Sequence, residues 1–344
     1  MQSSVKLHKD STNCKRFHVL AAILVAALGA CTLKPESPQS GKLTIAVIPK
    51  GTSHIFWQSV HAGAQKAATE LGIDVVWRGP LREDDRDSQV SEVEGFVSRG
   101  ISGIVLAPLD ETALVTPVSN ATHNKIPVVI FDSGLKSDNY VSFVATDNLK
   151  GGRLAGEHMA KLLGGKGKVV LLRYAEGSNS TTLREQGFLD VMKENPGIEV
   201  VSSNQYGGTD VEGAYKKSEA LLSRFKALDG NPSINGVFCP NESTTLGMLR
   251  AFEDNGWAGK VHFVGFDSSS ILAKGVRDGH IDALVLQDPV KMGYLGVKTI
   301  VAHIRGENVD RRIDTGVALV THENLEQKDI KDLVEPDLTK WLKQ

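Results

Sequence analysis

Residues 42–71 read KLTIAVIPKGTSHIFWQSVHAGAQKAATEL, and this stretch decides how the rest of the chain is interpreted. The run Thr44–Ile48 is short, apolar and rich in β-branched residues, as in a strand buried on both faces of a parallel sheet. Apolar residues then recur at helical spacing over residues 56–71, and Ser53 is placed to cap that helix. The polar loop at residues 50–54 therefore follows the carboxyl end of a strand, where ligands bind in open parallel sheets.

The same strand–loop–helix unit recurs along the chain. Short apolar runs predict further strands at 75–77, 103–107, 127–131, 141–145, 168–173, 200–202, 236–239, 262–266, 283–286 and 316–320. Helical periodicity predicts helices at 89–98, 113–122, 149–163, 182–193, 211–222, 246–252 and 292–304. The alternation indicates an α/β protein whose sheets are parallel and covered by helices on both faces. The pattern starts again at Asp147, which indicates two similar halves.

Polar residues follow the predicted strands in both halves: Lys50, Asp132, Asn241, Asp267 and Gln287. Any one of them is most simply a helix cap or a turn former. Five such endings favour a shared polar crevice between the halves. Phe56 and Trp57 add aromatic surface beside it, although helix packing explains at least one of the pair. Fixed polar groups beside a flat apolar wall suit a carbohydrate.

The first thirty residues have the pattern of an export signal. Four basic residues precede the apolar run 19–28, which is too short to span a membrane. The run ends at Leu28–Cys31, which resembles the bacterial lipoprotein box. We expect residues 1–30 to be a lipoprotein signal peptide, Cys31 to carry lipid and residues 31–42 to be a tether. A plain secretory signal with an incidental cysteine is the alternative.

Charge and cysteine content argue against a nucleic-acid-binding protein and against a disulfide-stabilised one. Without residues 1–30 the chain has 35 Lys or Arg and 40 Asp or Glu, whereas a nucleic-acid-binding protein needs a clustered basic surface. Cys14 is lost with the signal and Cys31 carries lipid, so Cys239 stands alone. No intramolecular disulfide is therefore expected.

Five segments resemble the ribose- and galactose-binding group of bacterial periplasmic binding proteins, the LacI-like family that serves ABC importers: Ala62–Lys66, Pro127–Asp132, Asp147–Asn148 with Gly151–Gly152, Asn241 with Gly247–Ala251, and Val264–Asp267. The resemblance implies a type I fold, in which a three-strand hinge joins two Rossmann-like lobes. The hinge crossings would fall near Asp147, Asp288 and Gly316. The N-terminal lobe would then comprise 43–147 plus 288–315, and the C-terminal lobe 148–287 plus 316–334.

The resemblance also implies a set of ligand-binding residues between the lobes. The first lobe would supply Lys50, His54, Phe56, Trp57, Asp132 and Ser133, and the second Arg184, Asn241, Asp267 and Gln287. A solvated helix residue is the alternative for Arg184. Three of these residues, Lys50, His54 and Ser133, differ in type from the residues that ribose binders have at the same positions. The aromatic residue that the family has in its second lobe is also missing at its usual position, and Tyr206 is the candidate to replace it.

These features predict an exported, membrane-anchored lipoprotein, in the periplasm or at the cell surface, that captures a pentose or hexose. The partner would be the ABC permease, and the protein would act as a monomer. Ile48–Lys50 and Asp132–Ser133 also resemble the binders of the furanosyl autoinducer. A lipoprotein that senses a sugar-like signal for a chemoreceptor or sensor kinase is therefore the alternative. The identity and the charge of the sugar stay open at this point.

We expect no enzyme. The sequence has no G-x-S-x-G, no H-E-x-x-H and no cysteine pair for zinc, so neither a cofactor nor a metal is predicted. Asp132 and Asp267 could form an acid/base pair, but hydrogen bonding to a sugar is the better interpretation. The acidic run Arg82–Asp87 is expected to be a solvated surface loop, and His54 is the one histidine expected in the crevice.

Overall fold

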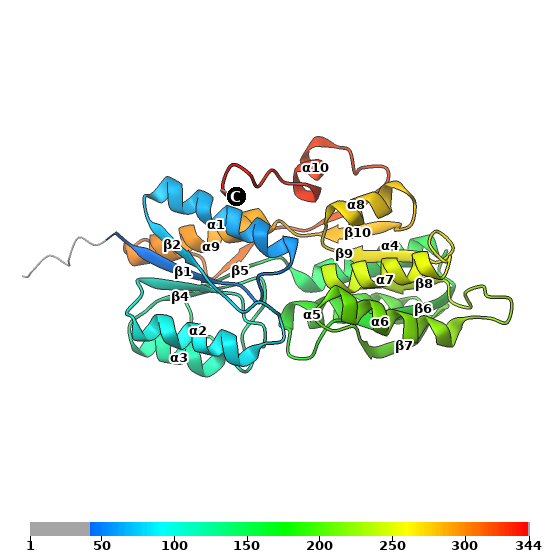
Figure 1. Cartoon of the computed structure of the whole chain (residues 1–344), viewed down its shortest axis with the longest axis horizontal. Coiled ribbons are helices and arrows are strands. Elements are labelled where there is room, and N and C mark those ends of the chain that lie inside the picture. The colour runs from blue at the N-terminus through cyan, green and yellow to red at the C-terminus, as the bar shows by residue number, and fades with distance from the viewer. Residues whose placement is uncertain (1–41, 343–344) are drawn as a thin grey trace, which may run out of the picture. The chain divides into compact units, whose positions relative to one another are not determined.

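The computed structural model describes residues 42–342, and the expected signal peptide, the expected lipid attachment at Cys31 and nearly all of the expected tether lie outside them. Two six-stranded sheets form the described chain (Figure 1). The first has the order β2-β1-β3-β4-β5-β11, with β1 Thr44–Ile48, β2 Asp74–Trp77, β3 Gly103–Leu106, β4 Val128–Phe131, β5 Ser142–Ala145 and β11 Arg312–Asp314. The second has the order β7-β6-β8-β9-β10-β12, with β6 Gly167–Arg173, β7 Ile198–Tyr206, β8 Gly236–Phe238, β9 His262–Phe266, β10 Ala283–Leu286 and β12 Ala318–Thr321.

Helices cover both faces of each sheet. In the first lobe α1 (Ile55–Leu71) and α9 (Pro289–Ile304) cover one face, and α2 (Arg86–Ser98) and α3 (Val115–His123) cover the other (Figure 1). In the second lobe one face packs against α4 (Asn148–Leu162) and α5 (Asn179–Glu194). The other packs against α6 (Val211–Leu222), α7 (Glu242–Asp254), α8 (Ser270–Arg277) and α10 (Lys328–Val334). A short 3₁₀ helix, Ser223–Phe225, follows α6. Each lobe is thus a three-layer α/β unit with two apolar cores.

The chain passes between the two sheets three times: from β5 to α4, from β10 to α9, and from β11 to β12. These passages make the hinge of a type I binding-protein fold. Every strand pair is parallel except β10 with β12. The third passage brings the chain into the second sheet from the hinge side, so β12 runs against its neighbour. The prediction of wholly parallel sheets was therefore wrong at this strand.

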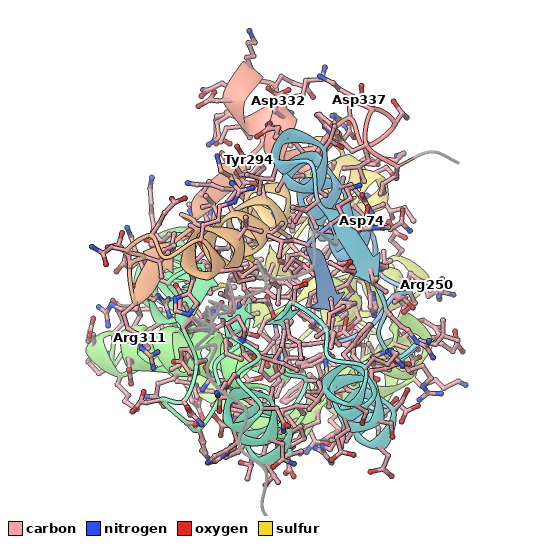
Figure 2. All side chains as sticks on the ribbon, turned by 90° about the vertical axis from the view of Figure 1, so that its left-hand side faces the viewer. Asp74, Arg250, Tyr294, Arg311, Asp332 and Asp337 are labelled. Atoms are coloured by element: carbon pink, nitrogen blue, oxygen red, sulfur yellow. The ribbon has the colours of Figure 1, made fainter. Side chains whose placement is uncertain are left out.

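Glycines allow the helices on one face of each lobe to touch. In the first lobe a Cβ on Gly63 of α1 would lie 1.9 Å from the Val290 carbonyl oxygen at the start of α9. Gly152 of α4 meets Arg184 of α5 in the same way, also at 1.9 Å. Tyr294 lies where α9 runs beside α1, and its hydroxyl donates to Glu70 Oε2 at 2.7 Å (Figure 2). Both lobes therefore use the same close helix contact.

Most predicted elements exist with shifted ends, but several predictions were wrong. The N-cap of α1 is His54 rather than Ser53, and its side chain caps nothing. Helices α8 and α10 and the three-residue strand β11 were not predicted, because their patterns are too short to stand out. Strand β7 is nine residues long where three were predicted, because its outer half is polar and does not form an apolar run. Within residues 42–342 no helix is both long and apolar enough to cross a membrane.

Candidate functional site

A polar cleft lies where the strands of both sheets end. Its walls leave about 350 Å³ of space, part of which is open to solvent. Fourteen residues line it: Lys50, His54, Phe56, Trp57, Glu83, Asp132, Tyr174, Ser180, Thr181, Arg184, Asn241, Glu242, Asp267 and Gln287. All the site residues implied by the sequence are in this set except Ser133. In each sheet the cleft lies at the carboxyl ends of the strands, at the topological switch point where the strand order reverses, as in other doubly wound sheets.

The two aspartates at the strand ends are held in an unusual backbone conformation. Asp132 follows β4 with φ of 58°, and Asp267 follows β9 with φ of 65°. Both are nearly fully buried. A non-glycine residue at positive φ stores strain that persists only where its surroundings enforce it, and such residues gather at binding sites. The equivalent placement in both lobes turns one carboxylate from each lobe into the cleft.

In the first lobe Lys50 supplies a cation beside Asp132. Its ammonium lies 3.1 Å from Asp132 Oδ2 and donates to two hydroxyls of the second lobe, Ser180 Oγ at 2.9 Å and Ser178 Oγ at 3.2 Å. Lys50 is 3% exposed, so burial without these partners would be costly. Lys50 thus joins the two lobes as well as lining the cleft.

In the second lobe Asp267 is the centre of a hydrogen-bonded group. Gln287 Nε2 donates to its Oδ1 at 2.7 Å, and the Glu242 backbone N–H donates to its Oδ2 at 3.1 Å. The Arg184 guanidinium lies 3.9 Å from Oδ2. Burial raises the pKa of Asp267, and the charge of Arg184 partly opposes that rise. The carboxylate is therefore fixed in place by one hydrogen bond to each oxygen, which leaves acceptor capacity for a ligand.

Arg184 is buried and held by several partners. Its Nε donates to Asn148 Oδ1 at 2.8 Å, its NH1 group donates to the Pro240 carbonyl at 3.0 Å, and the guanidinium stacks 4.0 Å from the Phe266 ring centroid. Burial lowers its pKa, against the opposing effect of Asp267. These contacts fix its orientation on α5, so a solvated surface role is excluded.

Two polar atoms of the cleft have no hydrogen-bond partner although they are buried. They are the NH2 group of Arg184, a donor, and Oε1 of Gln287, an acceptor. Among the described residues the other such side-chain atom is Ser202 Oγ, which lies outside the cleft lining. An unmade hydrogen bond on a buried group costs about 1–3 kcal/mol. A ligand hydroxyl can accept from the first and donate to the second, because a hydroxyl does both.

The aromatic wall is built at the start of α1. Phe56 and Trp57 meet edge to face with centroids 4.9 Å apart, and both are part of the first lobe's apolar core as well as the cleft lining. Trp57 Nε1 donates to Glu83 Oε1 at 2.6 Å. Gly51 makes room for this carboxylate, since a Cβ there would lie 2.7 Å from Glu83 Cγ. Trp57 is therefore held by both packing and a charged hydrogen bond.

Sequence reasoning missed three chemically important residues of the cleft: Glu83, Tyr174 and Glu242. The prediction of a solvated loop over Arg82–Asp87 was wrong at Glu83, whose side chain is 9% exposed. The Tyr174 hydroxyl, from the second lobe, donates to Glu83 Oε2 in a short hydrogen bond. Glu242 follows Asn241 directly, and that adjacency was the available signal. The expected aromatic at Tyr206 is not in the cleft; its ring packs against Arg173 instead.

The remaining expected residues also have defined positions. His54 Nε2 donates to the Thr209 carbonyl of the second lobe at 3.0 Å and lies 3.7 Å from Glu83 Oε1. Asn241 lines the cleft while its Oδ1 accepts from the Thr244 N–H as the N-cap of α7. Ser133 lies beside the cleft, where its Oγ accepts from the Ser180 N–H at 3.1 Å.

The pKa values of Glu242 and His54 depend on each other's charge as well as on burial. Burial raises the pKa of Glu242 to about 7; the charge of His54 opposes the rise and that of Asp267 adds to it. Burial by itself lowers the pKa of His54, but the carboxylates of Glu83 and Glu242 outweigh burial, and the net pKa is raised. The pair therefore shares protons in the neutral range.

The described residues offer neither a metal-binding cluster nor a reactive thiol. Within residues 42–342 no cluster of three or more His, Cys, Asp or Glu is arranged to hold a metal ion. Cys239 is buried, and burial raises the pKa of its thiol well above the usual value. A thiol of this kind is unreactive. The chemistry available is hydrogen bonding, charge pairing and apolar contact.

A larger hollow of about 740 Å³ adjoins the cleft beneath the C-terminal segment 333–338. It shares Phe56, Asp267 and Gln287 with the cleft, and most of its other lining is apolar or serine. We place the site in the smaller cleft because the charged side chains and both unpartnered buried atoms meet there.

Comparison with known proteins shows the same architecture elsewhere. A family described as "Periplasmic binding protein domain" matches residues 45–308. The ribose import binding protein RbsB of Haemophilus influenzae is 30% identical over 292 residues, covering 84% of this chain and 95% of that protein. A solute-binding protein of an ABC transporter from Agrobacterium vitis, solved with D-fucose, aligns with a TM-score of 0.80 at 35% identity and covers 85% and 99% of the two chains. A carbohydrate transporter solute-binding protein from Agrobacterium radiobacter, solved with D-arabinose, aligns with a TM-score of 0.79 at 35% identity and covers 86% and 100% of the two chains.

Proposed function

Because this chain belongs to the periplasmic binding protein domain family, we propose that it captures a monosaccharide outside the cytoplasm and delivers it to an ABC importer. Its relatives include a ribose import binding protein and a D-allose-binding periplasmic protein, and a similar carbohydrate transporter solute-binding protein was solved with D-arabinose. The ligand would be a pentose or hexose bound between the two lobes by the ten residues named from the sequence, together with Glu83, Tyr174 and Glu242. The partner would be the membrane permease of the importer.

The observation that supports this function best is the unpartnered donor of Arg184 facing the same cleft as the unpartnered acceptor of Gln287. Sugar hydroxyls satisfy both kinds of group at once. Phe56 and Trp57 offer the apolar surface that a sugar ring needs for its C–H face. No nucleophile–base pair accompanies these groups, so we propose binding without turnover.

Binding would act through closure of the lobes. Direct hydrogen bonds already cross between them, from Lys50 to Ser180, from His54 to Thr209 and from Tyr174 to Glu83. A sugar that touches both lobes adds contacts available only in the closed arrangement, so it shifts the equilibrium toward closure. The permease would recognise the pair of lobe surfaces that closure brings together.

We extend the proposal to the parts of the chain that the sequence alone addresses. The N-terminal lobe would comprise 43–147 plus 288–315 and the C-terminal lobe 148–287 plus 316–334. Residues 1–30 would direct export and Cys31 would carry the lipid that tethers the protein to a membrane. Residues 31–42 would be the flexible connection.

A sugar panel tests the function directly. Purified full-length protein would be heated with D-ribose, D-allose, D-arabinose, D-fucose, myo-inositol, D-glucosamine and D-galactosamine in separate samples. A ligand present at 100 times its Kd stabilises the folded protein by about 2.7 kcal/mol, which raises the unfolding temperature measurably. Chromatography after incubation should return the bound sugar unchanged. Failure of every neutral and amino-substituted monosaccharide to shift the transition would refute the assignment, and turnover of the sugar would overturn the claim of simple binding.

A further inference from the structure

The charges around the cleft do not balance. Two cations are matched to two carboxylates: Lys50 lies 3.1 Å from Asp132, and Arg184 lies 3.9 Å from Asp267. Two further carboxylates, Glu83 and Glu242, line the same cleft, and the remaining basic side chain there is His54. Even with His54 protonated, the cleft lining has one more negative charge than positive.

Glu83 is not the carboxylate that lacks a partner. Its two oxygens accept from Trp57 Nε1 and from the Tyr174 hydroxyl, and His54 Nε2 lies 3.7 Å away. These contacts satisfy both oxygens and place the nearest basic group beside Glu83. The surplus charge is therefore located at Glu242.

Glu242 is buried with little to stabilise its charge. It is 7% exposed, and its one hydrogen bond as an acceptor comes from the Phe56 N–H at the long distance of 3.4 Å. Among the described residues no Lys, Arg or His nitrogen lies within 4.0 Å of its carboxylate, as an ion pair would require. Glu242 is the first residue of α7, where the helix dipole favours a negative charge. Burial still raises its pKa to about 7, so the helix does not replace a cation.

A second acceptor without a donor lines the same cleft. Gln287 Oε1 is buried and has no hydrogen-bond partner. Gln287 and Glu242 both bond to Asp267, one through Nε2 and the other through its backbone N–H. The cleft therefore presents two poorly satisfied acceptors, the Glu242 carboxylate and Gln287 Oε1, besides the unpartnered NH2 donor of Arg184. An ammonium group has three donors and no acceptor, and so it complements these two acceptors.

Resting on the proposed function, we propose that the sugar bound here is an amino sugar whose ammonium group pairs with Glu242 and donates to Gln287. Its hydroxyls would meet Arg184 and the other charged groups of the cleft. Pairing would restore the ionised form of Glu242, so binding at neutral pH would release a proton from that carboxyl group. An acidic or phosphorylated sugar would add a negative charge to a site that already has a surplus, and it would be rejected.

Matched sugar pairs test the inference by titration calorimetry on the purified full-length protein. The pairs are D-glucosamine with D-glucose, D-galactosamine with D-galactose, D-mannosamine with D-mannose and 6-amino-6-deoxy-D-glucose with D-glucose. At least one amino sugar should bind tenfold or more tightly than its neutral parent. Its apparent enthalpy at pH 7 should vary with the ionisation enthalpy of the buffer, which reports proton release. Its affinity should rise between pH 6 and pH 7, as Glu242 ionises while the amino group of the sugar keeps its proton.

Two variants locate the effect. Glu242→Gln keeps the size of the side chain and removes its charge, so it should abolish the preference for the amino sugar and the proton release. Glu253→Gln, at the exposed far end of the same helix, should preserve both. Neutral sugars that bind as tightly as every amino partner would refute the inference and leave the proposed function standing. So would a preference that survives in Glu242→Gln. A protein that binds neither series would refute the proposed function itself.

Discussion

Replacing Glu242 with glutamine should stabilise the protein at alkaline pH and change little at acid pH. The pKa of Glu242 is raised from 4.5 to about 7, a difference of about 2.5 units. One unit corresponds to about 1.36 kcal/mol, so burying the ionised group costs up to about 3 kcal/mol. Below about pH 4.5 the carboxyl group is protonated in both the folded and the unfolded state, and the cost vanishes. As the pH rises to 7 the unfolded state loses this proton first, and the folded state is progressively destabilised.

Glutamine resembles the protonated form at every pH, so the variant avoids this loss. The free energy of unfolding of Glu242→Gln should exceed that of the parent by about 1–3 kcal/mol at pH 8 and by much less at pH 5. Urea unfolding followed by circular dichroism at both pH values measures the difference. Glu253→Gln is the matched control, because that side chain lies exposed on the same helix. A variant that is no more stable than the parent at pH 8, or equally stabilised at both pH values, would refute the reasoning about this buried carboxyl group.

Three further expectations follow from other parts of the molecule. Tyr174→Phe removes the hydrogen bond from the second lobe to Glu83, so ligand release should become roughly tenfold faster. Stopped-flow fluorescence measures this rate, and an unchanged rate would show that the bond does not hold the lobes closed. Gly63→Ala should lower the free energy of unfolding by about 1–3 kcal/mol, because the new methyl group would clash with the Val290 carbonyl. Gly95→Ala in α2 is the control and should not lower it, because the nearest atom to a Cβ there is 3.5 Å away. Equal effects of the two variants in urea unfolding would contradict the packing argument. Intact-mass analysis of membrane-fraction protein should find lipid on an N-terminal Cys31, and a soluble product with a free Cys31 thiol would exclude the anchor.

The sequence was sufficient to predict the fold because the fold depends on patterns that the chain repeats. Apolar runs of four or five residues, such as Thr44–Ile48 and His262–Phe266, are strands in both lobes. Polar residues directly after such strands, such as Asp132 and Asp267, do lie in the cleft. A short loop leaves such residues little freedom, so their position along the chain nearly determines their position in space.

The missed residues are those whose position depends on contacts far away in the chain. Glu83 lies in an acidic loop that looks solvated, and it enters the cleft because Trp57 and Tyr174 donate to it and Gly51 leaves room. Tyr174 follows β6 and meets a partner 91 residues earlier. The role of Glu242 depends on its having no cation at ion-pair distance among the described residues, and that is a property of the assembled cleft rather than of any local pattern.

The most direct test of the account is the affinity of a bound sugar for the parent protein and for Asp132→Ala and Asp267→Ala, measured by titration calorimetry. One aspartate from each lobe enters the cleft, and a hydrogen bond to a charged group is worth roughly 1.5–3 kcal/mol. Each variant should therefore bind about tenfold to a hundredfold more weakly while remaining folded. Asp138→Ala, a fully exposed aspartate of the first lobe, should bind as the parent does. If Asp132→Ala and Asp267→Ala bind the sugar as tightly as the parent, the cleft between the lobes is not the binding site.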